Sequence, residues 1–369
     1  MVIKKGSHKP FYTIILLLVL ILSGMNSKEV CAQDESQNSV RIGLMLSQDP
    51  EIDTTSMESL YTVQYLVQKV NSEGGIDGKK IELYYKSGDG DWGISSKKSV
   101  ELIFDDEVSA IIGSLDGRNA HLTQMAITKA EVVYIATRST DPTLSEINIP
   151  WFFRVIPSDK QQAEILVSSI FKERGLNNIA VIHSDDYDYK MAANTFNRLA
   201  SEKYRYSIQS FEFNEQNGIE ESGLISVLKS AEVNGVVIFS SDSSLKNILS
   251  LAGQMDYTIP YFLPLTDQNV LSEWKYLMDI SYLCPQIQPD FDQNFIQQFN
   301  SKFNRDPGLI AAYSYDGLQI LIDSIKKSGV GRMEIREKLK SVDQFHGLSG
   351  LIGFEDNGDI IHSTTVCKL

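Results

Sequence analysis

The chain has 369 residues, 42% of them apolar, which is enough for two domains of ordinary size with packed cores. Its formal net charge of −14 argues against a nucleic-acid partner and against an anionic membrane surface, because both would need clustered lysine and arginine. The 3 cysteines are too few for a disulfide scaffold, and the sequence leaves open whether Cys284 and Cys367 form a bridge.

Residues 1–32 have the pattern of a secretory signal peptide. Three lysines precede an apolar run at 11–22, and small residues at 30–32 suit a cleavage site. The run is shorter than the ~20 residues that a membrane-spanning helix needs. An uncleaved anchor and a lipid-modified Cys31 are the alternatives. We therefore expect a periplasmic or otherwise secreted protein.

From Val40 onward, short apolar runs alternate with amphipathic segments, which is typical of parallel sheets covered by helices. In a first α/β unit we expect strands at 41–46, 80–86, 108–113 and 131–136 and helices at about 60–73, 94–104 and 119–129. The first of these helices ends at the glycine pair 74–75, which accepts a left-handed C-cap.

The alternation breaks near 152–157 and then starts again. In a second unit we expect strands at 178–184, 206–213 and 235–241 and helices at about 159–174, 189–203, 220–232 and 243–255. Further along the chain we expect a helix at 311–327. No linker rich in Pro, Gly or Ser separates the units, so we expect extended strands to join them. A cleft between two such units is where ligands usually bind.

The segment 88–93 contains a G-x-G-x-x-G between a predicted strand and a predicted helix, and Asp116 lies at about the distance of a ribose-binding acid. Asp89 and Asp91 would oppose a pyrophosphate, and Trp92 would crowd it. The loop also follows the second strand of its unit, whereas the dinucleotide motif follows the first. We interpret it as a surface turn and expect no cofactor.

Other motifs do not indicate catalysis or a metal. The sequence has no nucleophile elbow, Walker loop or H-E-x-x-H motif. The acidic stretch 184–189 lacks the glycine and distal glutamate of a calcium-binding EF-hand loop, which favours a solvated loop at a strand end. We expect no enzyme activity and no metal site.

Two loops suit a small-molecule site better. Segment 113–119 joins a strand to a helix, whose first N–H groups can hold an anion. Segment 136–142 also follows a strand and offers two hydroxyls beside Arg138. The alternative is that both loops hold only capping and turn residues.

Six segments in order resemble the periplasmic solute-binding proteins of the branched-chain amino acid (Leu/Ile/Val) ABC transporter type. They are "VNSEGGIDGKKIEL", "SAIIGSLDGRNAHLTQMAITKAEVVYIATRSTDPTLS", "PWFFRVIPSDKQQA", "NIAVIHSDDYDYKMA", "AAYSYDGLQILIDSIKKSG" and "FHGLSGLIGFEDNGDI". The resemblance spans nearly the whole chain after the signal peptide.

The resemblance implies an α/β fold of two Rossmann-like lobes, the type I periplasmic-binding fold, joined by a three-crossing hinge near residues 157, 267 and 350. Lobe one is expected to comprise 38–157 plus 268–349, and lobe two 158–267 plus 350–369.

The resemblance also implies a ligand site between the lobes. Its expected members are Asp116, Gly117, Arg118, Arg138, Ser139, Thr140, Tyr187, Tyr189, Asp242 and Asp267. A ligand's carboxylate is expected at Gly117, Ser139 and Thr140. The family commonly has serine where Gly117 stands, and a small residue where Arg138 stands.

The ammonium side of the expected site departs further from the family. The family's tyrosine corresponds to Tyr187 or Tyr189, and the spacing leaves both open. Its acidic partner aligns near Ser244, which carries no charge, and Asp242 is the only nearby substitute in the sequence. Arg138 beside a weakened ammonium pocket suits an acid without an amino group, which we keep as a hypothesis.

The expected function is the capture of a small polar ligand, an amino acid or related carboxylate, by closure of the lobes for an ABC importer. A sensory component that signals to a membrane receptor or kinase is the alternative, and an enzyme is the third class. Neighbouring genes for a permease or a kinase would separate the first two, and turnover of a bound ligand would reveal the third.

Overall fold

The computed structural model describes residues 39–88, 93–206, 208–229, 233–254, 258–275, 277–361 and 364–369. The predicted signal peptide and the middle of the glycine-rich segment 88–93 lie outside the described residues. Gly93, where that segment ends, has a φ of 89° and begins the next helix.

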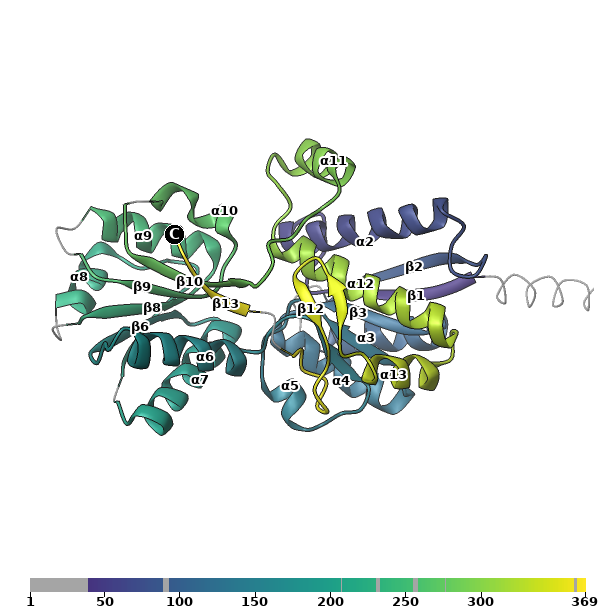
Figure 1. Cartoon of the computed structure of the whole chain (residues 1–369), viewed down its shortest axis with the longest axis horizontal. Coiled ribbons are helices and arrows are strands. Elements are labelled where there is room, and N and C mark those ends of the chain that lie inside the picture. The colour runs from purple at the N-terminus through teal and green to yellow at the C-terminus, as the bar shows by residue number, and fades with distance from the viewer. Residues whose placement is uncertain are drawn as a thin grey trace, which may run out of the picture.

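The first lobe is built on a parallel sheet with the strand order β2-β1-β3-β4-β5 (Figure 1). Its strands are β1 (Ser39–Leu46), β2 (Lys80–Ser87), β3 (Ala110–Ser114), β4 (Val133–Ala136) and β5 (Phe152–Arg154). Its helical segments are α2 (Thr54–Ser72), α3 (Ile94–Val100), the π turn η1 (Glu101–Asp105), α4 (Gly117–Ala130), α5 (Thr143–Glu146), α12 (Leu309–Ser328) and α13 (Arg332–Lys340). Helix α12 packs along α2 and α13, while α3 packs against α4.

The second lobe repeats this order, β7-β6-β8-β9-β10, and adds β13 at the edge beside β10 (Figure 1). Its strands are β6 (Ile179–Ser184), β7 (Gln209–Phe213), β8 (Gly235–Phe239), β9 (Tyr261–Leu265), β10 (Ile280–Pro285) and β13 (Thr364–Lys368). Only β13 is antiparallel to its neighbour. Its helical segments are α6 (Asp159–Val167), the π turn η2 (Ser168–Glu173), α7 (Tyr187–Tyr204), α8 (Glu221–Lys229), α9 (Asp242–Gly253), α10 (Gln268–Leu271) and the 3-10 turn η3 (Ser272–Trp274).

The central strands are buried along their whole length because helices cover both of their faces. Every residue of β3, β4, β6 and β8 is buried. The expected strands and helices of both units are found, with ends that shift by a few residues. The prediction of two parallel sheets flanked by helices is confirmed.

Two segments lie in a different lobe from the one expected. Strand β10 falls in the range 268–349 expected for lobe one, yet it pairs with β9 in the second sheet. Residues Ile352, Phe354 and Ile360 were expected in lobe two, yet they belong to the core of the first lobe. Ile352 ends β12 (Gly350–Ile352), which pairs with β11 (Phe345–Gly347) in a hairpin, and β11 contacts α12 of the first lobe.

The two remaining cysteines form a disulfide within the second lobe. Cys284 on β10 is bonded to Cys367 on β13, with 6.0 Å between their Cα atoms and a sequence separation of 83. The bridge therefore ties the last strand of the chain to the second sheet, and it is consistent with an oxidising compartment.

Helix α11 (Gln293–Phe303) projects from the first lobe above the line of the two sheets (Figure 1). It is held by an aromatic cluster in which its Phe295 and Phe299 lie against Tyr61 of α2. No helix in the described parts of the chain is both long enough and apolar enough to cross a membrane.

Candidate functional site

A cavity of about 450 Å³ lies where the carboxyl ends of the two parallel sheets face each other. The first lobe contributes residues that follow β1, β3, β4 and β5, and the second contributes residues that follow β6, β7 and β8 or end β9. Parallel α/β sheets usually bind ligands at this edge. We call this cavity the interlobe cleft.

Four of the ten expected site residues line the interlobe cleft: Asp116, Arg138, Thr140 and Tyr189. Asp116 caps helix α4, since its Oδ1 accepts a hydrogen bond from the Asn119 N–H at 2.9 Å. Arg138 donates to the Ser47 hydroxyl at 3.1 Å. The first turn of α7 supplies Tyr189, and burial raises the pKa of its phenol.

Three further expected residues make contacts between the lobes beside the cleft. The Gly117 N–H donates to both carboxylate oxygens of Asp188, at 2.9 and 3.3 Å. The Tyr187 hydroxyl donates to Asp141 Oδ2 at 3.0 Å. The Arg118 guanidinium lies 4.9 Å from the centre of the Tyr187 ring, in cation–π contact. Of the two alternative tyrosines, Tyr189 therefore lines the cleft and Tyr187 joins the lobes.

These contacts shift the pKa values of the groups involved. Burial raises the pKa of Asp188 to about 6, and neighbouring Asp116 adds to the shift. Burial and then Asp141 raise the pKa of Tyr187 to about 12. Burial would also raise the pKa of Asp141, but hydrogen bonds from His121 and Thr143 outweigh it and lower the pKa to about 2.

Ser139 is buried away from the cleft at 1% exposure. Its carbonyl accepts a hydrogen bond from Arg154 at 3.4 Å, and its hydroxyl has no hydrogen-bond partner among the described residues. The loop 136–142 thus turns only Arg138 and Thr140 toward the cleft.

Asp242 and Asp267 line a neighbouring cavity of about 320 Å³ instead. Asp267 Oδ2 accepts a hydrogen bond from the Leu309 N–H at 3.1 Å, so this aspartate links the end of β9 to the start of α12. The buried Glu58 and its ion-pair partner Arg305 line the same cavity.

The sequence interpretation missed an acid that lies beside Ser244 in space but not in sequence. Glu215, in the loop after β7, accepts a hydrogen bond from the Ser244 hydroxyl at 2.7 Å and also bonds the Ser241 hydroxyl. It lines the interlobe cleft, whereas Asp242 does not. Glu215 is far from Ser244 in sequence, and the two meet because β6 brings the ends of β7 and β8 to the same sheet edge.

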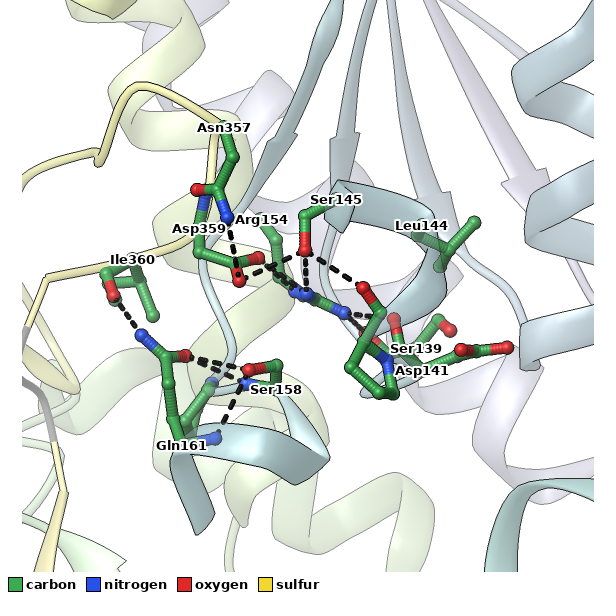
Figure 2. Close-up of polar contacts among 12 residues, drawn as sticks. Ser139, Asp141, Leu144, Ser145, Arg154, Ser158, Gln161, Asn357, Asp359 and Ile360 are labelled. Carbon is green, nitrogen blue, oxygen red and sulfur yellow. Dashed lines mark hydrogen bonds and ion pairs between the residues drawn. The ribbon is translucent and has the colours of Figure 1, made fainter. Parts of the chain in front are cut away.

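A second missed residue, Arg154, holds the loop 136–142 in place beside the cleft (Figure 2). It lies on β5 with 0% exposure, and it is paired with Asp359 from the C-terminal part of the chain. It also donates to the Asp141 carbonyl at 2.7 Å and to the Ser145 hydroxyl at 3.0 Å. An arginine inside the apolar run "FFRV" was the available signal, because a fully buried arginine needs partners.

The same region joins the lobes at the start of α6 (Figure 2). Ser158 and Gln161 form a capping box there. Gln161 also donates to the Ile360 carbonyl at 2.6 Å, just before the chain passes to β13. Two of the chain segments that connect the lobes are thus hydrogen-bonded to each other beside the cleft.

In the part of the chain that the structure describes, no three His, Cys, Asp or Glu side chains are placed to hold a metal ion. The acidic stretch 184–189 instead caps helix α7, where Asp186 accepts from the Asp188 N–H at 3.0 Å.

Comparison with known proteins agrees with this architecture. A family model described as "Periplasmic binding protein" matches residues 39–369. The leucine-, isoleucine-, valine-, threonine- and alanine-binding protein of Pseudomonas aeruginosa is 22% identical over 306 residues, which are 80% of each chain. Glutamate receptor 2.7 of Arabidopsis thaliana is 24% identical over 174 residues, and this match spans 47% of the chain but only 18% of the receptor.

Solved structures show the same fold. The branched-chain amino acid transporter substrate-binding protein LivJ from Streptococcus pneumoniae, in complex with isoleucine, superposes with a TM-score of 0.74 at 18% identity, covering 90% of this chain and 100% of that one. A solute-binding protein from Rhodopseudomonas palustris, in complex with 3,4-dihydroxybenzoic acid, gives 0.75 at 18% identity, covering 90% and 93%. These likenesses confirm the expected type I periplasmic-binding fold.

The family match covers nearly all of the chain beyond its first 38 residues. The chain therefore belongs to the periplasmic binding protein family, which confirms the prediction of an extracytoplasmic binding protein and not an enzyme.

Proposed function

We propose that this chain captures a small polar solute, an amino acid or a related compound, in the interlobe cleft and delivers it to an ABC permease. The observation that carries the proposal is the cavity of about 450 Å³ lined by polar residues of both lobes. The permease partner and the solute class are supported by the family and by the ligands of similar proteins, such as isoleucine in the Streptococcus pneumoniae structure.

Closure of the lobes is the mechanism that this geometry supports. A solute that touches both lobes binds the closed form more tightly and so shifts the equilibrium toward it. The chain already has protein contacts across the cleft, through Asp188 to Gly117 and through Tyr187 to Asp141. These contacts favour closure, and a bound solute adds to them.

A thermal-shift screen of the purified protein tests the proposal. A solute that binds only the folded state at 100 times its Kd adds about 2.7 kcal/mol to the free energy of unfolding, which raises Tm by several degrees. Amino acids, amines, amides and carboxylates form the panel. A rise in Tm that Thr140→Ala and Tyr189→Phe weaken supports the interlobe cleft as the site. A protein that responds to no compound in the panel contradicts the proposal.

A further inference from the structure

We propose that the interlobe cleft selects an organic ammonium ion that has no free carboxylate, with Asp159 and Glu215 as its counter-charges and Asp188 in the position expected for a ligand's carboxylate. The inference rests on the proposed solute-binding function and narrows its ligand class.

The charges that line the cleft are strongly unbalanced. Arg138 is the only cationic side chain on its wall within the described residues. The acidic side chains there are Asp53, Asp116, Asp159, Asp186, Asp188 and Glu215. A cationic solute would reduce the repulsion among these groups, whereas an anionic solute would increase it.

Asp159 presents an unpaired oxygen to this cavity. Its residue is 6% exposed, and its Oδ2 has no hydrogen-bond partner among the residues described. Burial raises the pKa of Asp159 well above its usual value, and a hydrogen bond from Thr140 offsets this only in part. A buried oxygen without a partner is costly, so an ammonium N–H donor at this point would be stabilised strongly.

Glu215, in the loop after β7, has the same arrangement, and like Asp159 at the start of α6 it belongs to the second lobe. Its Oε1 is held by the hydroxyls of Ser241 and Ser244, while its Oε2 is buried without a partner in the described structure. The second lobe therefore presents two anchored carboxylates to the cleft, each with one oxygen that has no partner among the described residues.

The Gly117 N–H, which was expected to receive a ligand's carboxylate, is already in use, and Arg138 uses one of its N–H donors on a protein group. Asp188 accepts a hydrogen bond from the Gly117 N–H. The Arg138 guanidinium donates to the Ser47 hydroxyl, and its charge partly offsets the burial that raises the pKa of Asp188. The approach is close because Gly117 has no side chain: a Cβ at this position would lie 2.6 Å from Asp188 Oδ1. The glycine and the aspartate thus fit each other as a pair.

The walls of the cleft favour an organic cation over a metal ion. Ile156, Ala192, Phe239, Leu265 and Ile310 form an apolar lining next to the acids. No set of three metal-binding side chains occurs in the described residues. A short alkylammonium ion would contact the apolar lining with its alkyl group and the acidic side chains with its ammonium group.

The test is isothermal titration of the purified protein with four compounds of similar size at one ionic strength: n-butylamine, 1,4-diaminobutane, butyrate and valine. We expect the amines to bind and butyrate not to bind, with valine weaker than butylamine. Asp159→Asn should weaken amine binding by at least about 10-fold, the scale of one charge-assisted hydrogen bond. Asp105→Asn, which removes an exposed charge at the far end of the first sheet, should leave it within about 2-fold.

A gain of binding completes the test. Asp188→Ala should vacate the Gly117 N–H and leave Arg138 without its neighbouring acid, so butyrate or valine should then bind. Tight binding of valine or butyrate to the unaltered protein, with no amine binding, overturns the inference but leaves the solute-binding function intact. Amine binding that Asp159→Asn does not change also overturns it. Binding of none of the four compounds contradicts both proposals.

Discussion

The cluster around Arg154 and Asp359 and the interlobe cleft both contain buried charged groups, but they differ in whether these groups have partners. Arg154 and Asp359 have partners for their charged atoms and hold loops and chain segments together. In the cleft, Asp159 and Glu215 each keep one oxygen without a partner. Fully paired buried charges stabilise one arrangement of the chain, whereas unpaired ones are costly unless something else completes them. The contrast separates a structural cluster from a binding site.

The largest effect should come from breaking the paired cluster. Arg154→Ala leaves Asp359 buried without its partner, and we expect the free energy of unfolding to fall by about 3–5 kcal/mol. Chemical denaturation measures this loss. Arg198→Ala is the matched control, because its ion pair with Glu202 is exposed and should change stability by less than about 1 kcal/mol. Equal effects of the two variants would show that the buried ion pair stabilises the fold no more than the exposed one.

In the cleft, removing a buried charge should raise the free energy of unfolding instead of lowering it. Asp188 has a folded-state pKa of about 6, above the usual value of 3.8, so the folded state binds the extra proton. Its contribution to stability is therefore full below pH 4 and is lost as the pH rises through 6. Asp188→Asn should abolish this loss and make the variant more stable than the parent at pH 7, by less than about 3 kcal/mol.

Denaturation at pH 4, 5, 6 and 7 would check this difference. The carboxylates of Asp116 and Asp186 and the guanidinium of Arg138 face Asp188 and set the size of the effect. A constant difference between parent and variant across this range would show that Asp188 does not titrate in the folded protein near pH 6.

A smaller effect should follow from a methyl group at the contact between the lobes. Gly117→Ala puts a Cβ about 2.6 Å from Asp188, so the lobes must separate or shift. We expect the closed form to lose about 1–3 kcal/mol relative to the open one, the usual scale of overpacking. Small-angle scattering should show a larger radius of gyration for the variant, and Gly253→Ala at the exposed end of α9 serves as a control, because it has open space around it and no left-handed backbone.

The smallest effect should come from Tyr187→Phe, which removes only the hydroxyl bonded to Asp141. The ring and its contact with Arg118 remain. We expect closure to weaken by about 1 kcal/mol, the usual net value of such a hydrogen bond. Solute affinity, measured by titration, should fall about 5-fold, and an unchanged affinity would show that this contact does not contribute to closure.

Much of the fold could be predicted because its signals are local. Apolar runs such as the one in β6 and the glycines after α2 mark strands and helix ends within a few residues. The pairing of β10 with β13 was not visible, because it joins segments about 80 residues apart and depends on the order of the sheet.

The site could be predicted only in part, for the same reason. The loops after β3 and β4 were found from their position at strand ends, and Asp116, Arg138 and Thr140 do line the cleft. Glu215 and the contact of Asp188 with Gly117 were missed, because they depend on strand order and on the placement of one lobe against the other. No periodicity in the sequence reports that placement.

The most direct test of the central claim is the pKa of Asp159, followed by carbon-13 NMR of its carboxyl group and assigned by comparison with Asp159→Asn. The account predicts a pKa well above the usual aspartate value in the free protein and a clear fall when n-butylamine fills the cleft. An ordinary pKa of Asp159 in the free protein, or a pKa that the amine does not change, would contradict the claim that Asp159 is an unpaired buried acid that binds a cationic solute.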